Sequence, residues 1–186
     1  MTFELIKPSI DRLASYVAAL KSHWSPDNVR GEEVAREHIA AVAKDPAAFV
    51  ESLDDPGGRG GPLILPDGST VPRLPSVRRW AWDGDFVGSF GLRWQADGSA
   101  LPEHVLGHIG FSIVPWKRER GYATRGLALM LDEARQRGLS YVELTADPDN
   151  EPSQKVMLAN GGVLLGRFPK VDAYGGGESL RYRIEL

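Results

Sequence analysis

The chain has 186 residues, 42% of them hydrophobic and 25% charged, which is the size and composition of a single globular domain. It contains no cysteine, which excludes disulfides, thiolate metal sites and a cysteine nucleophile and favours a cytoplasmic location. The net charge of −3 lacks the strong positive excess of a dedicated nucleic-acid-binding protein, and charged residues interrupt the apolar stretches of the first twenty positions. We therefore expect neither nucleic acid nor a membrane as a partner.

The first part of the chain predicts one strand and two helices, followed by a loop-rich segment. Alternation predicts a strand from Phe3 to Lys7, and apolar periodicity predicts helices from about Ile10 to Lys21 and from Glu32 to Lys44. Residues 54–75 are rich in glycine and proline and include the turn signature Pro66-Asp67-Gly68-Ser69. We expect a hairpin or an excursion there and no domain boundary.

The rest of the chain predicts more strands with two helices between them. Val77 to Trp82 and Phe86 to Trp94 have the pattern of an antiparallel hairpin, and Val105 to Val114 that of a central strand. An amphipathic helix that stops at Gly138 comes next. The remaining predicted elements are the strand Tyr141 to Ala146, the helix Pro152 to Asn160, and the strands Val163 to Phe168 and Leu180 to Leu186. This order favours an α/β or α+β fold with helices on both faces of one sheet.

The segment Arg118-Glu119-Arg120-Gly121-Tyr122-Ala123-Thr124 lies between a predicted strand and the amphipathic helix. The N-terminus of a helix offers unpaired N–H groups and the positive end of the helix dipole. Gly121 allows the backbone to approach a ligand closely, and Arg118 and Arg120 add positive charge. The segment therefore predicts a cradle for a pyrophosphate, although a solvated arginine-rich turn would have the same spacing.

The same segment resembles the acyl-CoA signature of the GCN5-related N-acetyltransferase (GNAT) superfamily. That signature is Arg or Gln, two residues, Gly, one residue, then Gly or Ala, and Arg118, Gly121 and Ala123 fit it. The resemblance extends from about Gly107 to Phe168 and is similar in detail to a branch of bacterial predicted acetyltransferases. It implies a mixed, mostly antiparallel sheet with a splayed central pair of strands and helices on both faces.

The resemblance also implies that acetyl-CoA is the acyl donor and that an amine attacks its thioester directly. The pantetheine arm would pair with backbone groups of Ile113 and Val114, and the pyrophosphate would accept N–H groups from the cradle. Asn150 would contact the pantetheine or adenylate side, and Ser153 would cap the following helix close to it. The residues expected to bind the cofactor are Ile113, Val114, Arg118, Glu119, Arg120, Gly121, Tyr122, Ala123, Thr124, Asn150 and Ser153.

Direct attack requires a base, an oxyanion donor and a route for the thiolate to leave. His108 is the first candidate for the base because an imidazole titrates near neutral pH, although a buried histidine satisfied by a neighbour would show the same pattern. The backbone N–H of Val114 is expected to stabilise the oxyanion. The resemblance implies a tyrosine as the acid, but Met157 stands in that place and cannot donate a proton. Tyr174, in a glycine-flanked loop, could substitute for it.

The acceptor is expected to be chosen by residues 1–105, including the excursion, whereas residues 106–186 bind CoA within the same domain. Arg93 could bind a carboxylate of the substrate or form an ordinary salt bridge. An edge strand near Leu63 to Leu65 could pair in a homodimer. No metal is expected, because only His104 and His108 are close in sequence and no carboxylate pair accompanies them.

Two functions of different classes follow. The first is an N-acetyltransferase that acts on a primary amine of a small molecule or peptide. The alternative, suggested by Met157, is a non-catalytic acyl-CoA or ligand-binding module of the same fold. Another kind of nucleotide-binding domain is disfavoured, since the chain has neither a G-x-x-x-x-G-K-S/T loop nor a G-x-G-x-x-G motif at Gly121.

Overall fold

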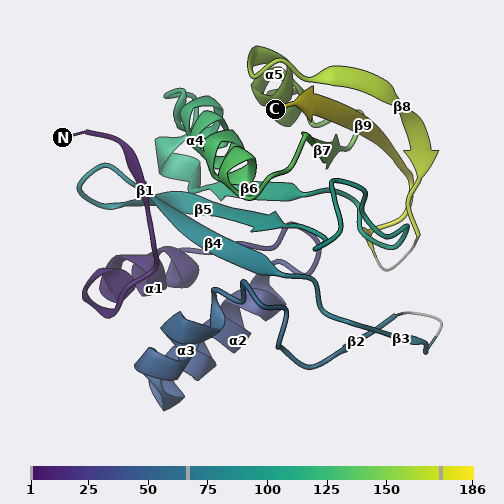
Figure 1. The fold of residues 1–186 in the computed structure, drawn as a ribbon. Coiled ribbons are helices and arrows are strands. Elements are labelled where there is room, and N and C mark those ends of the chain that lie inside the picture. Colours follow the sequence, from purple (N-terminus) through teal and green to yellow (C-terminus); the bar gives the residue numbers. More distant parts are fainter. Residues whose placement is uncertain (1, 66–67, 172–173) are drawn as a thin grey trace.

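A computed structural model describes residues 2–65, 68–171 and 174–186 (Figure 1). Its first sheet has four strands in the order β1-β4-β5-β6, and its second has three in the order β7-β9-β8. The first sheet comprises β1 (Glu4–Ile6), β4 (Ser76–Trp82), β5 (Phe86–Arg93) and β6 (Ile109–Ile113). The second comprises β7 (Tyr141–Ala146), β8 (Val163–Pro169) and β9 (Glu178–Glu185). All strand pairs among the described residues are antiparallel, as expected from the resemblance.

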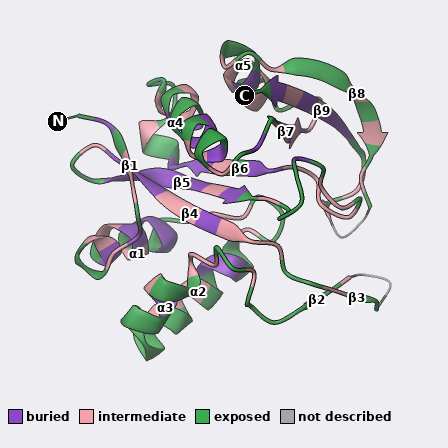
Figure 2. Ribbon diagram, in the orientation of Figure 1, coloured by how far each residue is buried: buried purple, intermediate pink, exposed green. Residues whose placement is uncertain are grey.

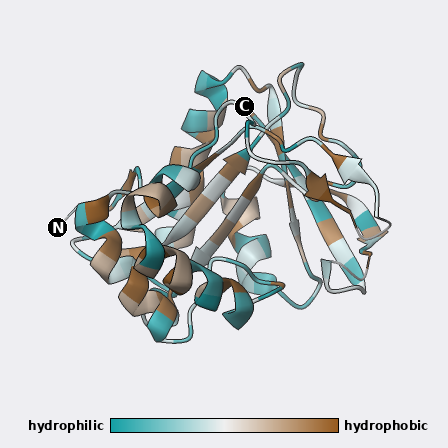
Figure 3. Cartoon of the chain, turned by 90° about the horizontal axis from the view of Figure 1, so that it is seen from below, coloured by the Kyte–Doolittle hydropathy of each residue, from teal (hydrophilic) through white to brown (hydrophobic). Residues whose placement is uncertain are grey.

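Helices cover both faces of the first sheet, which confirms the expected architecture (Figure 1). One face carries α1 (Leu13–Lys21), α2 (Glu32–Lys44) and α3 (Pro46–Ser52), and the other carries α4 (Tyr122–Gln136) with α5 (Glu151–Ala159) beside it. Figure 3 views the molecule from the side of α1, α2 and α3, and these helices mix hydrophilic and hydrophobic residues, as amphipathic helices on a sheet do. Short 3₁₀ turns, Ile10–Arg12 and Pro115–Lys117, precede α1 and α4.

The alternation of side chains along β4 and β5 creates two hydrophobic cores. Ala81 and Phe90 face α4 and pack with Leu127 in the first core. Trp80 faces the opposite side and stacks on Tyr16 of α1, with the ring centroids 4.7 Å apart, in the second core. Figure 2 shows buried residues concentrated in the strands between the two groups of helices. The sheet is therefore covered on both faces, and β5 runs through its centre.

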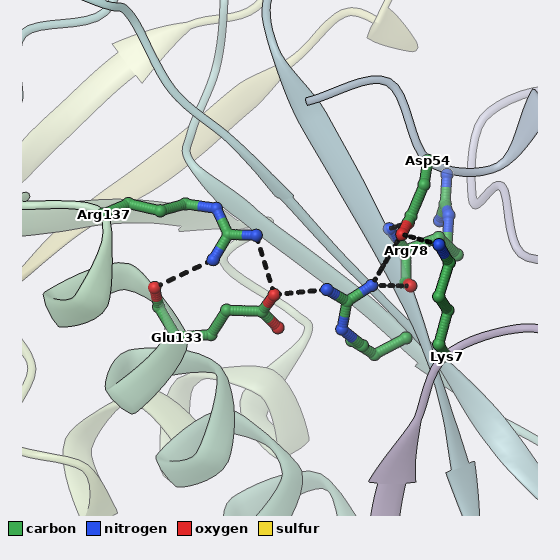
Figure 4. A network of polar contacts seen from close by, with 6 residues as sticks. Lys7, Asp54, Arg78, Glu133 and Arg137 are labelled. Carbon is green, nitrogen blue, oxygen red and sulfur yellow. Dashed lines mark hydrogen bonds and ion pairs between the residues drawn. The ribbon is translucent and has the colours of Figure 1, made fainter. Parts of the chain in front are cut away.

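An ion-pair network joins the first sheet to α4 (Figure 4). Arg79 of β4 pairs with Asp54 at 3.1 Å on one side and with Glu133 of α4 on the other. Glu133 also pairs with Arg137 at 2.9 Å, and Lys7 lies 3.8 Å from Asp54. The side chains of Arg79, Asp54 and Glu133 are largely buried, so the network fixes α4 against the strand that it covers.

Several predicted boundaries differ from the structure. The helix expected from Ile10 begins as a 3₁₀ turn, and the central strand starts at Ile109 instead of Val105. The excursion contains the expected hairpin, because β2 (Leu63–Ile64) pairs with β3 (Thr70–Val71). Pro66 and Asp67 of the predicted turn lie outside the described residues. In the described part of the chain, no helix is both long and apolar enough to cross a membrane.

Candidate functional site

A cavity of about 750 Å³ opens where β6 ends and α4 begins. Its walls come from the end of β6, the start of α4, the loop before α5 and α5 itself. Most of the residues expected to bind a cofactor line this cavity, although they come from two separate stretches of the chain, 113–124 and 150–153. They are Ile113, Arg118, Glu119, Gly121, Tyr122, Ala123, Thr124, Asn150 and Ser153. Val114 and Arg120 are not among the lining residues.

The backbone before α4 forms a concave row of donors. Glu119 and Gly121 both adopt the left-handed conformation, with φ of 61° and 73°. The Arg118 N–H donates to Pro115 O and the Arg125 N–H to Gly121 O, but the six amides of residues 119–124 have no acceptor among the described residues. Alternating left-handed residues at the start of a 15-residue helix direct such amides towards an anion. Residues 119–124 therefore present N–H groups with no acceptor among the described residues, at the segment where the sequence predicts the cradle.

Asp83, in the turn between β4 and β5, holds this cradle in place. Its carboxylate accepts hydrogen bonds from Lys117 Nζ and from the Tyr122 hydroxyl, each at 2.6 Å. Partial burial raises the pKa of Asp83, but the hydrogen bonds from Lys117 and Tyr122 outweigh burial and lower it overall. Asp83 thus remains ionised and neutralises the charge of Lys117. Arg118 and Arg120 form no ion pair with any described residue, and Arg118 Nε donates to Ile113 O at 3.2 Å.

The end of β6 presents backbone groups to the cavity in a way that differs from the expectation. The Val114 N–H donates to Val87 O at 3.0 Å, so it is already used within the sheet and is not free to stabilise an oxyanion. Because N–H directions alternate along a strand, the N–H of Ile113 points away from β5, towards the side where β6 and β7 separate. Ile113, and not Val114, therefore offers the free backbone donor at the cavity.

The helix α5 begins differently from the prediction. Asn150 is its N-cap, and Asn150 Oδ1 accepts the Ser153 N–H at 3.2 Å. Ser153 is thus the third residue of the helix and not its cap, although both residues line the cavity. Lys155, on the same helix, also lines it and pairs with Glu151 at 3.2 Å.

His108 lies outside the cavity lining and is completely buried. Its Nε2–H donates to Ser99 O at 3.0 Å, and its Nδ1 accepts the Glu143 N–H at 2.8 Å. Its backbone N–H donates to Glu143 O at 2.7 Å. Burial lowers its pKa, which keeps the imidazole neutral in the tautomer that these partners require. His108 thus joins β6 to β7 at the point where the two sheets meet, and neither ring nitrogen is available to a substrate.

The other predicted catalytic and substrate-binding residues also lie away from the cavity. Met157 is 1% exposed and belongs to the hydrophobic core. The Tyr174 hydroxyl donates to His104 O at 2.7 Å. Arg93 is exposed at the end of β5, and its guanidinium forms no hydrogen bond or ion pair within the described residues.

The sequence offered no signal for two cavity residues, Asn28 and Ser112. Asn28 lies in the loop between α1 and α2, far from the cradle in sequence. Ser112 Oγ accepts from Trp24 Nε1 at 3.0 Å and donates to Ser25 O at 3.1 Å, which anchors this loop on β6. Within the described ranges, no group of three or more His, Asp or Glu residues is placed to hold a metal ion.

Comparison with solved structures shows the same fold in several acetyltransferases. The microcin C7 self-immunity acetyltransferase MccE, solved with acetyl-CoA and AMP, has a TM-score of 0.63 at 11% identity, covering 99% of this chain and 92% of that one. RimL, a ribosomal L7/L12 alpha-N-protein acetyltransferase solved with coenzyme A, has a TM-score of 0.64 at 11% identity, with coverages of 100% and 95%. Mycobacterium smegmatis RimJ, solved with CoA-disulfide, has a TM-score of 0.61 at 18% identity, with coverages of 98% and 81%.

A search of curated protein sequences returned no match. A family model does match, however: residues 72–163 fit the model described as an acetyltransferase (GNAT) domain. This range contains the cradle, the free end of β6 and the capped start of α5. The chain therefore carries a GNAT acetyltransferase domain, in agreement with the resemblance of its Arg118 to Ala123 segment.

Proposed function

We propose that this protein is an acetyl-CoA-dependent N-acetyltransferase that transfers the acetyl group to a primary amine by direct attack. The observation that carries the proposal is the row of amides at residues 119–124, which have no acceptor in the described part of the chain and lie beside the cavity at the end of β6. Coenzyme A bears a pyrophosphate, and a row of N–H groups at a helix N-terminus fits that anion. The GNAT domain match and the CoA-bound proteins of the same fold support this assignment.

The donor would bind along two backbone surfaces. Its pyrophosphate accepts the amides of residues 119–124, with Arg118 and Arg120 adding charge-assisted contacts. Its pantetheine amides pair with the free edge of β6 through the carbonyl of Ile113, which leaves the N–H of this residue for the thioester. This arrangement brings the thioester to the point where β6 and β7 separate, with Asn28 and Ser112 on the acceptor side of the cavity.

The chemistry requires little from side chains. The neutral amine attacks the thioester carbon, the carbonyl oxygen gains negative charge, the C–S bond breaks and the ammonium proton is lost to solvent. The free N–H of Ile113 is the donor that we assign to the oxyanion, in place of Val114. An alkyl thiol has a pKa near ~8.5, so the thiolate can leave without an acid, which accommodates the buried Met157. We place the reaction in the cytoplasm, in keeping with a chain that lacks cysteine.

A second candidate function rests on Met157. Because this side chain is buried and cannot donate a proton, the fold could bind acyl-CoA without turning it over. Release of free thiol from acetyl-CoA separates the two functions when it is measured with a panel of small amines, lysine side chains and free peptide N-termini. Amine-dependent release, with an acetylated product detected by mass spectrometry, supports the transferase. Tight binding of acetyl-CoA with release at the amine-free rate for the whole panel supports the binding module instead.

A further inference from the structure

Two arginine side chains lie outside the cavity lining, on the face of the first sheet opposite α4. Arg78 of β4 is directly opposite Gly91 of β5, and Arg93 follows Gly91 by two residues. Since side chains alternate along a strand, Arg78 and Arg93 are diagonal neighbours on one face, about 7–8 Å apart at their backbones. The two guanidinium groups therefore share one region of the surface.

The floor of this region consists of glycines. Gly91 of β5 is paired with Gly110 of β6, so these two adjacent strands lack side chains at the same level. A Cβ placed on Gly91 would lie 3.4 Å from Arg78 Nη1, so the guanidinium of Arg78 extends over Gly91. A Cβ placed on Gly110 would meet nothing within 4 Å, and Gly110 is exposed although it lies within β6. The result is an open hollow above the strands with a cation at its side.

Neither guanidinium has a hydrogen bond or an ion pair with any residue that the structure describes. The next residue, Arg79, is the opposite case, because its side chain pairs with both Asp54 and Glu133. Arg78 enters that network only through its backbone, whose N–H donates to Asp54 and whose carbonyl accepts from Arg79. A guanidinium group without a partner at a sheet surface can form charge-assisted hydrogen bonds with an anion.

Nearby groups offset the burial of these two cations only in part. Burial lowers the pKa of Arg78, and Tyr16, Asp27 and Asp54 oppose the change. Burial and the charge of Arg78 lower the pKa of Arg93, and Tyr174 and Asp27 oppose the change. Asp27 is itself occupied, because its Oδ1 accepts the backbone N–H groups of Val29 and Arg30 at 2.8 and 2.7 Å. Arg93 is exposed and Arg78 is half-buried, so both residues are accessible to solvent.

We propose that Arg78 and Arg93 bind an anionic group of the acceptor, so that the substrate is an amine that also carries a carboxylate or a phosphate. This inference rests on the proposed function. Ser112, two residues beyond Gly110 on β6, lines the cavity, so the glycine floor lies two residues along the strand from it. Ile113 lies three residues beyond Gly110, or about 10 Å along an extended strand. The amine and the anion of the acceptor are therefore separated by about 10 Å, the span of roughly three extended residues.

That separation suits a peptide N-terminus followed by an acidic residue, and it also suits a small amino acid with a long chain.

Two matched pairs of acceptors distinguish these sources. The peptide pair is Ser-Ala-Glu-Ala against Ser-Ala-Gln-Ala, both with an amidated C-terminus, and the small pair is 6-aminohexanoate against its amide. We expect kcat/KM to be at least tenfold higher for the anionic member of one pair. We expect Arg78→Gln and Arg93→Gln each to remove most of that preference, because each variant leaves the shape of the floor unchanged.

The matched control is Arg36→Gln, which removes a positive charge from an exposed pair with Glu32 on α2 and should keep the preference. A second readout does not depend on turnover. Glutarate should shift the backbone amide resonances of Gly91 and Gly110 saturably in wild-type protein containing saturating coenzyme A, and both arginine variants should lose the shift.

Three outcomes overturn the proposal. They are equal kcat/KM within both acceptor pairs, an unchanged preference in both arginine variants, and the absence of a saturable glutarate shift at Gly91 and Gly110. Failure of the proposed function has a different signature, since acetyl-CoA would then neither bind nor release thiol, whereas the glycine resonances would still report glutarate in the CoA-free protein.

Discussion

His108 shows how one buried side chain can hold two sheets together. It joins Ser99 and Glu143 through both ring nitrogens, and it adds a backbone hydrogen bond to Glu143 where β6 and β7 meet. Removing the ring leaves the Glu143 N–H without its acceptor in a buried setting, which costs about 1–3 kcal/mol. The free energy of unfolding of His108→Ala, measured in urea at pH 7.5, should fall by about that amount or more, since a cavity also forms.

The same residue can be tested for the role of a general base. A base would make His108→Gln nearly inactive while the protein stays folded. If His108 only joins β6 to β7, the folded fraction of His108→Gln should still release thiol at a measurable rate. The pH–rate profile of this variant should then be parallel to that of the wild type. We predict the second result, and a hundredfold or greater loss of kcat in fully folded His108→Gln would assign the base to His108.

His108 should also make stability depend on pH in a predictable direction. Burial lowers its pKa in the folded state below the value near 6.5 that an exposed histidine has, so the unfolded chain binds the proton more readily. Its contribution is complete above about pH 6.5 and is lost as the pH falls towards the folded-state pKa. Unfolding free energies measured from pH 8 to pH 5 should decline less in His108→Gln than in the wild type, while the two slopes agree above pH 7.5. His38, whose pKa burial also lowers, supplies the part that remains.

Residue types and spacings located most of the candidate site, but they could not assign each atom's partner. The segment from Arg118 to Thr124 was found because its glycine and arginines precede an amphipathic helix, a local pattern. The roles of Val114 and His108 depend on Val87, Ser99 and Glu143, which are distant in sequence. No local pattern shows which backbone amide a sheet has already used.

Among the elements, α4 depends on a close approach between Gly126 and β5. A Cβ at Gly126 would lie 2.2 Å from Cζ of Phe90, whose side chain is fully buried. Gly126→Ala should therefore destabilise the protein by about 1–3 kcal/mol, although alanine favours helices more than glycine does. Phe90→Leu combined with Gly126→Ala should cost less than the sum of the two single changes in urea unfolding, because the smaller side chain makes room. Strict additivity would show that the contact is not limiting.

The start of α5 gives a second prediction at this scale. Asn150 supplies the capping oxygen, so Asn150→Ala should lower the unfolding free energy by about 1 kcal/mol. Ser153→Ala should change it by less, because the capping bond uses the Ser153 backbone and not its hydroxyl. If Ser153→Ala lowered the unfolding free energy more than Asn150→Ala did, in thermal or urea unfolding, Ser153 and not Asn150 would be the cap.

Element prediction succeeded where a pattern is local and strong. Glu32–Lys44 and Tyr141–Ala146 coincide with α2 and β7. The sequence Asp45-Pro46 indicated the end of a helix, and it does end α2. It also begins α3, because Asp45 accepts the Ala48 N–H at 3.0 Å and proline is tolerated in a first helical turn. The pairing order of the strands is set by contacts between distant segments, so only the resemblance anticipated it.

At the scale of the whole molecule, the edge of the first sheet and one of its faces contribute different parts of the site. β6 ends the first sheet with a free edge, and the cradle and α5 flank the opening that this edge creates. The opposite face of the same sheet carries Arg78, Arg93 and the two glycines of the hollow. Donor and acceptor would therefore approach β6 from different sides. The homodimer through the exposed strand β2 stays a prediction, and the molecular mass in solution tests it.

Titration calorimetry of acetyl-CoA against two glycine variants tests the cradle most directly. Gly121 and Gly138 stand at opposite ends of α4, with φ of 73° and 78°, and a Cβ on either would meet nothing within 4 Å. Glutamate at either position therefore brings similar backbone strain and the same charge, but only Gly121→Glu places a carboxylate beside the expected pyrophosphate. We predict saturable binding to wild type and Gly138→Glu, with affinity for Gly121→Glu reduced about tenfold or more, or at least about 1.4 kcal/mol. Absence of binding to the wild type, or equal affinity in the two variants, would contradict acetyl-CoA binding at this cradle.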